Sequence, residues 1–325
     1  MLSFKTTPGR LVPAGQRAEY RIVSDRTQTI DIRLTDSQSG ELLGTGRFAE
    51  VAEALFDAAP IVRRHMRFLP KRSRASGFVA MEDRCRTVIA TAFPTDDPDN
   101  PIVSEASIFY AGTEEATVPS FITTMPLQRL IAPGQQDELT LLSDETPWIT
   151  ITAEGPDGEK RHAYNTFNSF VNPFRINADD FPGAERITVE ARSGGKVEYT
   201  VVPVPQGARR IAWRSHAGSI EHYTFPIETE TAVEVSKSRI RGVEGRSTVA
   251  VAAGRRMRLR SAYETREMLE SLAEIVASPE VWLADDDRYI PVDVTTDRAV
   301  IHRHGVLSLL EIEIQPQEES FVSWK

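Results

Sequence analysis

The chain has 325 residues, of which 40% are hydrophobic and 26% charged, and its formal net charge is −9. This composition is typical of folded globular proteins and excludes the collagen-like, disordered and coiled-coil classes. The acidic balance disfavours nucleic acid and anionic membranes as partners. No apolar run approaches the roughly 20 residues that span a bilayer, and the first ten residues lack the apolar core of a signal peptide. We therefore expect no membrane span and no export signal.

The strongest internal signal is a repeat. Residues 10–19 (RLVPAGQRAE) match residues 129–138 (RLIAPGQQDE) without a gap, at an offset of 119. The same offset places Ser24 and Asp25 on Ser143 and Asp144, and Ile30 and Ile32 on Ile149 and Ile151. Because a repeat fixes the domain count, we predict two domains of the same fold.

Each copy reads as short strands separated by turns. Residues 20–23 and 29–34 alternate apolar and polar side chains around a Ser-Asp turn, and residues 139–142 and 148–152 repeat this scheme. Such spacing is typical of antiparallel β-sandwiches. We predict tandem immunoglobulin-like sandwiches, the first over residues 1–127 and the second over 128–205.

The first copy carries an insertion near residues 47–75. Residues 48–59 are rich in helix formers and end at Pro60, which predicts one short helix. The basic segment after it has two interpretations, a loop that contacts a partner and an ordinary solvated surface. Its candidate interface residues are Arg63, Arg64, Lys71, Arg72 and Arg74.

Cys85 is the one cysteine, so the chain forms no internal disulfide and no site built on several cysteines. It alternates with Arg84 and Arg86 at strand spacing. We interpret it as a small buried hydrophobe, not a reactive thiol.

The pattern changes at about residue 206, and residues 206–325 are predicted to form a β-rich α+β module. Residues 209–225 read as a hairpin with a tight turn at Ala217-Gly218, and residues 230–235 and 248–252 as two further strands. Thr265 is placed to cap one amphipathic helix, whose apolar side chains are Met268, Leu269, Leu272, Ile275 and Val276. Strands return after the helix.

Three arginines alternate along a predicted strand in this module: Arg256, Arg258 and Arg260. Residues two apart on a strand share a face, so the three cations lie together. They form either a solvated face or an assembly interface that pairs with acidic neighbours, since guanidinium groups recognise carboxylates through two hydrogen bonds.

Few residues have the spacing of a catalytic or metal-binding site. His302 and His304 share a strand face and could bind one metal ion, but no third ligand is near. His216 and His222 flank the Ala-Gly turn beside several polar residues, which resembles a hydrolytic triad only superficially, and a hairpin tip with surface polar side chains is favoured. The acidic runs at residues 96–100 and 285–287 lack the ligand spacing of a calcium loop. No phosphate-binding or dinucleotide-binding motif is present, so we predict no catalytic residue, no metal and no cofactor.

The last unit carries a resemblance to a known group of proteins. Residues 213–225 (WRSHAGSIEHYTF), the following helix and residues 278–283 (SPEVWL) resemble tail or baseplate-associated structural proteins of bacteriophages and prophages in Bacteroidetes-type hosts. The match covers about a third of the chain and departs from the pattern at Ser215, where asparagine is expected. The resemblance implies a virion part with immunoglobulin-like modules, made in the host cytoplasm.

Both lines of reasoning favour a non-enzymatic structural protein of a phage tail, with other tail or virion proteins as partners and a homo-oligomer as the expected state. The alternative is a carbohydrate-binding or receptor-binding sandwich, for which Trp148, Tyr164 and Phe167 are candidate surface aromatics. A third class, an enzyme using His302, His304 and Glu311 or the region of His216, remains open to a metal and activity test.

Overall fold

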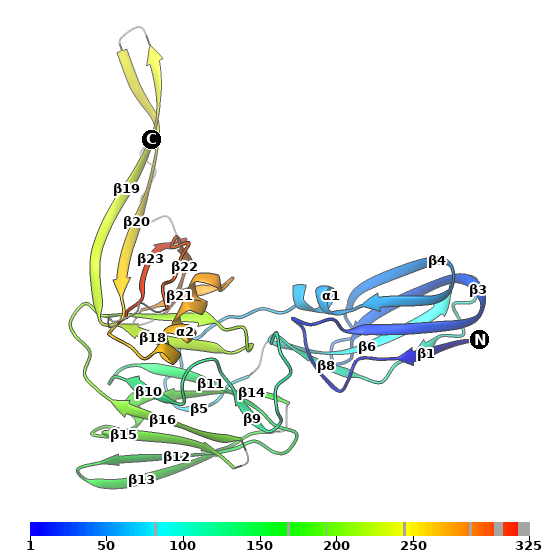
Figure 1. The fold of residues 1–325 in the computed structure, drawn as a ribbon, viewed down its shortest axis with the longest axis horizontal. Coiled ribbons are helices and arrows are strands. Elements are labelled where there is room, and N and C mark those ends of the chain that lie inside the picture. The colour runs from blue at the N-terminus through cyan, green and yellow to red at the C-terminus, as the bar shows by residue number, and fades with distance from the viewer. Residues whose placement is uncertain are drawn as a thin grey trace.

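The computed structural model describes residues 1–80, 83–167, 170–192, 194–242, 245–285, 288–301 and 308–317. Within these residues the chain is mainly β, arranged in antiparallel sheets that gather into three modules (Figure 1). No helix in the described ranges is long and apolar enough to cross a membrane.

The first module is one hydrogen-bonded sheet with the strand order β1-β3-β6-β8-β2, to which β4 adds beside β3 and β7 beside β6. Its elements are β1 (Leu2–Thr6), β2 (Leu11–Pro13), β3 (Glu19–Asp36), β4 (Leu42–Asp57), α1 (Ala59–Arg64), β6 (Cys85–Pro94), β7 (Ile102–Val103) and β8 (Ser107–Tyr110). Tyr20, Ile22, Ile32 and Leu34 are fully buried in its core.

The second module is a sandwich of two sheets, with strand orders β10-β16-β15-β12-β13 and β5-β14-β11-β9. Its elements are β5 (Gly77–Phe78), β9 (Ser120–Ile122), β10 (Gln128–Ile131), β11 (Gln136–Leu142), β12 (Trp148–Gly155), β13 (Gly158–Asn165), β14 (Val171–Asn177), the 3-10 helix Ala178–Asp180, β15 (Arg186–Ala191) and β16 (Gly195–Val201). Ile149, Ile151 and Val189 of one sheet pack against Leu139 and Phe174 of the other.

The two modules share one pairing scheme. β2 pairs with β8 in parallel as β10 pairs with β16, and the order then continues through β6 and β3 as it does through β15 and β12. The first half of β3 pairs with β1 and the end of β4, as β11 pairs with β9 and β14. The first module is thus the same sandwich, with β3 and β4 continuing from one layer into the other. The predicted fold class, tandem immunoglobulin-like sandwiches, is confirmed.

Two local predictions for the first module are wrong. Residues 48–57 belong to strand β4, and the helix of the insertion, α1, begins at Ala59. Likewise Ser24 and Asp25 lie inside the continuous strand β3 instead of forming a turn. β4 pairs with β3 from Leu42 to Asp57, and these hydrogen bonds outweigh the helix preference of its alanines and glutamates. A bulge near Glu50, whose φ is 48°, lets the two strands bend together.

The third module is a seven-stranded sheet covered on one face by a helix. Its elements are β17 (Arg209–Arg214), β18 (Ile220–Phe225), β19 (Ile227–Gly242), β20 (Gly245–Arg260), α2 (Arg266–Ala277), β21 (Val281–Ala284), β22 (Tyr289–Val294) and β23 (Glu311–Pro316). Thr265 accepts a hydrogen bond from the Met268 amide (3.2 Å), and Leu269, Leu272 and Ile275 face the core with Trp213. The predicted capped amphipathic helix is confirmed.

Candidate functional site

A segment of the first module ties the other two together. Residues 65–80, which we call the strap, leave α1 and supply β5, which pairs with β14 at the edge of the second sandwich. The Arg72 guanidinium donates to the Asp285 carbonyl of the third module (2.9 Å), and the Ser73 amide donates to the Gln136 side chain (3.0 Å). The strap therefore contacts both later modules, although it belongs in sequence to the first.

A buried ion triad lies beside the strap. Glu138 of β11 accepts from Arg84, which precedes β6, and lies 3.3 Å from Nε of Arg175 on β14. Burial alone would raise the pKa of Glu138, but the guanidinium of Arg84, assisted by Arg175, outweighs it and holds that pKa below its usual value. Glu138 is thus a buried anion compensated from two modules.

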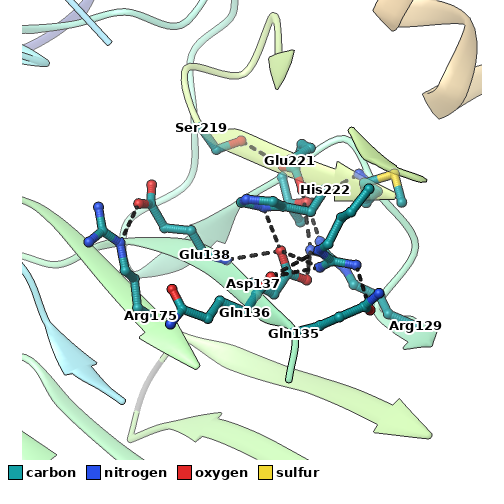
Figure 2. A network of polar contacts seen from close by, with 12 residues as sticks. Arg129, Gln135, Gln136, Asp137, Glu138, Arg175, Ser219, Glu221 and His222 are labelled. Atoms are coloured by element: carbon teal, nitrogen blue, oxygen red, sulfur yellow. Dashed lines mark hydrogen bonds and ion pairs between the residues drawn. The ribbon is translucent and has the colours of Figure 1, made fainter. Parts of the chain in front are cut away.

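Asp137 occupies the centre of a second buried network (Figure 2). Its Oδ1 lies 2.9 Å from Nδ1 of His222 on β18, and its Oδ2 lies 3.4 Å from Nη1 of Arg129 on β10. The same Arg129 nitrogen lies 3.2 Å from Oε2 of Glu221. Each of these side chains is at most 2% exposed, so the ions stabilise one another without solvent.

Asp137 and His222 at the centre of the network change each other's pKa. Burial would raise the pKa of Asp137, but the contact with His222 and the charge of Arg129 hold it well below its usual range. Burial lowers the pKa of His222, and Asp137 offsets only part of that effect. Because this pKa lies below the ordinary value for histidine, His222 is neutral at pH 7. The tautomer that fits carries its proton on Nδ1 toward Asp137, while Nε2 accepts from the Tyr289 hydroxyl at 2.9 Å.

Arg210 of β17 completes the link between the second and third modules. Its Nε and Nη2 donate to the Gln136 carbonyl at 3.1 and 2.8 Å, and its Nη1 donates to the Gln135 side chain at 3.1 Å. These bonds satisfy the start of β11 with a side chain from another module. The junction is consequently held by paired polar groups at its centre.

The polar residues around the Ala217-Gly218 turn are not the surface hairpin tip that the sequence predicts. Ser215, Ser219, Glu221 and His222 are buried, and the Ser219 hydroxyl donates to Glu221 at 2.6 Å. The prediction failed because the turn packs against the end of the first module, where the Thr113 amide donates to the His216 carbonyl (2.8 Å). His216 itself points to Glu274, 2.9 Å away, and does not join His222.

The candidate interface residues of the basic segment divide by location. Arg63 and Arg64 lie in the last turn of α1, and Lys71, Arg72 and Arg74 lie in the strap. Arg72 is engaged within the chain, as described above, and the Arg74 carbonyl accepts from the Asn177 side chain (3.3 Å). A role of these residues in contacts with other proteins stays a prediction.

The three arginines of β20 find their acidic partners within the chain. Arg256 binds Glu313 (2.7 Å) and Glu234 (2.8 Å), and Arg258 binds Glu230 and Glu313 (both 3.1 Å). Arg260 binds Glu311 at 3.0 Å. This ladder joins β19, β20 and β23 at the base of a long hairpin, and its use as an assembly interface stays a prediction.

Beyond the ladder, the hairpin projects from the body of the molecule (Figure 1). We call residues 235–254 the arm. Among the described residues, β20 pairs with β23 from Met257 to Arg260 only, and the two strands of the arm pair only with each other. At about 3.3 Å per residue, the eight residues from Val235 to Gly242 extend roughly 26 Å. Val235 and Ile240 are 50% and 55% exposed on it.

A groove of about 570 Å³ lies between the second and third modules, next to the buried network. Met125, Leu130, Val204 and Met268 give it an apolar lining, while Glu264 and Glu267 add carboxylates. Leu130 is 62% exposed and Val204 is 41% exposed, so both apolar side chains are accessible in the groove. The groove therefore combines accessible apolar surface with negative charge.

The aromatic residues proposed for glycan binding do not share a surface. Arg192 stacks over Trp148, with its Cζ 5.0 Å from the ring centroid, and Tyr164 packs edge-on against Phe174. Phe167 is 95% exposed and lines a separate groove of about 380 Å³ with Phe78 and Phe170. That lining includes neither Trp148 nor Tyr164.

His302, His304, Asp286 and Asp287 lie outside the described residues. Across the described ranges, no group of three or more His, Cys, Asp or Glu side chains is arranged to hold a metal ion. Cys85, expected to be a small buried hydrophobe, is partly buried against the core cluster of Tyr110 and Leu142, and burial raises the pKa of its thiol to about 12.

Sequence reasoning missed the buried network, although the repeat contains a signal for it. At the offset of 119, Asp137 falls on Ala18, a residue 2% exposed in the first core. A carboxylate in a place where the other copy buries a methyl group indicates a compensating partner. Nothing in the sequence says that this partner is His222.

Comparisons with known proteins assign this chain to no family. No protein-family model and no curated protein matches the chain. Among solved structures, Dpr2 Ig1-Ig2 in complex with DIP-Theta Ig1-Ig3 covers 62% of this chain and 98% of its own, at 11% identity and a TM-score of 0.18. Salmonella alpha-2-macroglobulin reacted with methylamine covers 81% of this chain and 18% of its own, at 10% identity and a TM-score of 0.22. A protein of unknown function from Porphyromonas gingivalis W83 covers 62% of this chain and 99% of its own, at 8% identity and a TM-score of 0.14. Scores this low carry no argument.

Proposed function

We propose that this chain is a non-enzymatic structural subunit that works through protein–protein contacts, as a component of a bacteriophage tail or baseplate. The observation that carries the proposal is the arm. A two-stranded ribbon is marginally stable in water by itself and gains stability when a third strand or another surface covers it. A protein that projects such a ribbon from a braced body has a surface suited to assembly.

The three-module body supports the same function. The triad of Glu138 and the network of Asp137 connect the modules through buried, paired groups, and the strap adds strand pairing with the second sandwich. Buried ion pairs favour one arrangement, because displacement would leave charges without partners. A rigid body that presents an arm at a fixed angle is what a repeating assembly requires. The phage tail as the setting, and the virion as the location, rest on the resemblance of residues 213–225.

The test is the mass of the native protein. We expect the purified full-length chain to form a homo-oligomer in sedimentation velocity and native mass spectrometry, with the oligomer fraction rising with concentration from low to high micromolar. Electron microscopy of the same sample should show rings or short filaments. A chain that stays at 36.2 kDa throughout this range, and captures no partner from a phage-producing lysate, contradicts the proposal.

A further inference from the structure

We propose that the arm of one copy binds in the groove between the second and third modules of a second copy. This inference rests on the proposed function and names the partner of the arm. Its two surfaces are those defined above, the arm of residues 235–254 and the groove lined by Leu130, Val204, Glu264 and Glu267.

The arm is basic in an acidic chain. It contains Lys237, Arg239, Arg241 and Arg246 against one acidic residue, Glu244, which gives it +3. Since the whole chain carries −9, the remainder carries −12. Electrostatic attraction therefore draws the arm toward the body of another copy, and this attraction acts on association before any contact forms.

The groove offers apolar side chains and carboxylates that match the exposed side chains of the arm. The arm exposes Val235 and Ile240, and the groove exposes Leu130 and Val204. Glu267 is exposed, and Glu264 is half-buried beneath the Tyr223 hydroxyl, which donates to it at 2.7 Å. Two cations lie near these carboxylates. Arg129 lines the groove but is paired with Asp137 and Glu221, and Arg266 is bound by Glu270 on the same helix (2.8 Å). The apolar lining of the groove can therefore contact Val235 and Ile240, while its carboxylates can pair with the lysine and arginines of the arm.

The arm and the groove are different surfaces, so the contact is head-to-tail. Contacts of this kind between identical chains build rings when the rotation closes and filaments when it does not. The roughly 26 Å reach of the arm allows it to extend past the edge of its own body to the next copy. This geometry distinguishes the proposal from a symmetric pair of arms.

Nucleic acid is the other class of ligand for a basic ribbon. The −12 on the rest of the chain opposes a polyanion, and two exposed aliphatic side chains gain nothing from phosphates. The observations therefore favour the second copy. Binding of the purified protein to duplex DNA, tested in parallel, would overturn the assignment if the DNA bound to the arm while the copies stayed monomeric.

Two variants test the arm. In the first, an Asn-Gly turn replaces residues 236–252, which keeps the pairing of Val235 with Ala253 and leaves the core residues Met257 and Leu259 in place. The second is the triple variant Lys237→Glu, Arg239→Glu and Arg241→Glu. A matched control makes the same change in net charge at three exposed sites elsewhere, Lys5→Glu, Arg17→Glu and Lys160→Glu.

We expect both arm variants to run as monomers with an unchanged Tm, the triple variant near the 36.2 kDa of the parent chain and the shortened variant at its own lower mass. We expect the control to assemble like the parent chain. If the parent assembles and both arm variants do so to the same extent, the arm proposal is overturned while the assembly function stands. If the parent itself is monomeric, the proposed function fails first. The two failures are therefore distinguishable.

Cross-linking tests the groove. A carbodiimide joins a lysine amine directly to a carboxylate, and mixing isotope-labelled with unlabelled copies identifies the links that form between chains. We expect an intermolecular link from Lys237 to Glu267 or Glu264, and its loss with Leu130→Arg, which leaves both carboxylates in place but repels the basic arm. Intermolecular links from Lys237 to carboxylates of another module would overturn the groove as the acceptor.

Discussion

Asp137 and His222 meet at the junction of the second and third modules with Oδ1 and Nδ1 2.9 Å apart, and each side chain is 2% exposed. One residue is on the first long strand of a sandwich and the other is on a hairpin that follows it by 85 positions in sequence. Their contact makes the stability of the junction depend on pH. The folded protein holds Asp137 as an anion and His222 as a neutral imidazole, and acid protonates both.

The folded protein should lose stability as the pH falls. His222 has a folded pKa below its ordinary value, so the unfolded chain binds more protons once the pH drops below about 6.5. Asp137 and Glu138, whose folded pKa values are also lowered, add further losses below about pH 4. We expect the Tm to fall from pH 7 to pH 5, and more steeply below.

His222→Gln isolates the first part of that dependence. Glutamine keeps a donor for Asp137 but does not titrate, so the slope of Tm against pH between 7 and 5 should decrease, while Tm at pH 7 is lower because the fit is poorer. His162→Gln, at an exposed position on β13, is the control and should keep the parent slope. Equal slopes in all three proteins would show that His222 does not carry the effect.

Glu138→Gln should be strongly destabilising. The substitution keeps the shape of the side chain but leaves the guanidinium groups of Arg84 and Arg175 buried with no counter-charge. Loss of one partner in a buried pair costs about 3–5 kcal/mol. Urea unfolding measures this value. Glu154→Gln, which removes an exposed partner of Arg186, should cost less than about 1 kcal/mol. Similar losses for the two variants would contradict the structure.

Gly218→Ala should disturb the contact between the first and third modules. Gly218 has φ +91°, and a Cβ there would lie 2.8 Å from the backbone nitrogen of Gly112. Strained backbone and overpacking together should cost about 2–4 kcal/mol. Gly40 has a similar φ, +73°, with open space around it. Gly40→Ala should therefore cost only about 1 kcal/mol. If chemical denaturation gives equal costs, the close approach at Gly218 is wrong.

Phe78→Ala should release the strap from the second sandwich. The Phe78 ring lies 5.1 Å from that of Phe174, centroid to centroid, and the two residues pair between β5 and β14. We expect faster hydrogen exchange at Val79, whose amide donates to the Pro173 carbonyl (3.0 Å), and a loss of about 1–2 kcal/mol. Phe48→Ala removes a comparable half-buried ring from the first module and should leave exchange at Val79 unchanged.

Local pattern was sufficient where each element buries its own apolar face. The alternation along residues 148–152 placed Ile149 and Ile151 in a sandwich core, and Thr265 marked the start of α2. The local pattern was not sufficient to predict the structure of residues 48–57, where alanine and glutamate favour a helix. There the neighbouring strand β3 supplies the hydrogen bonds that decide the outcome.

The sequence alone determined the repeat, the sandwich class and the capped helix, since these follow from periodicity and turn chemistry within short segments. Only the tertiary structure decided that the strap completes another module's sheet, that His222 is buried against Asp137, and that the arm extends beyond its base. These features depend on partners far away along the chain. Hydrogen bonds and charges between distant residues leave no local period in the sequence, so they appear only when the modules pack together.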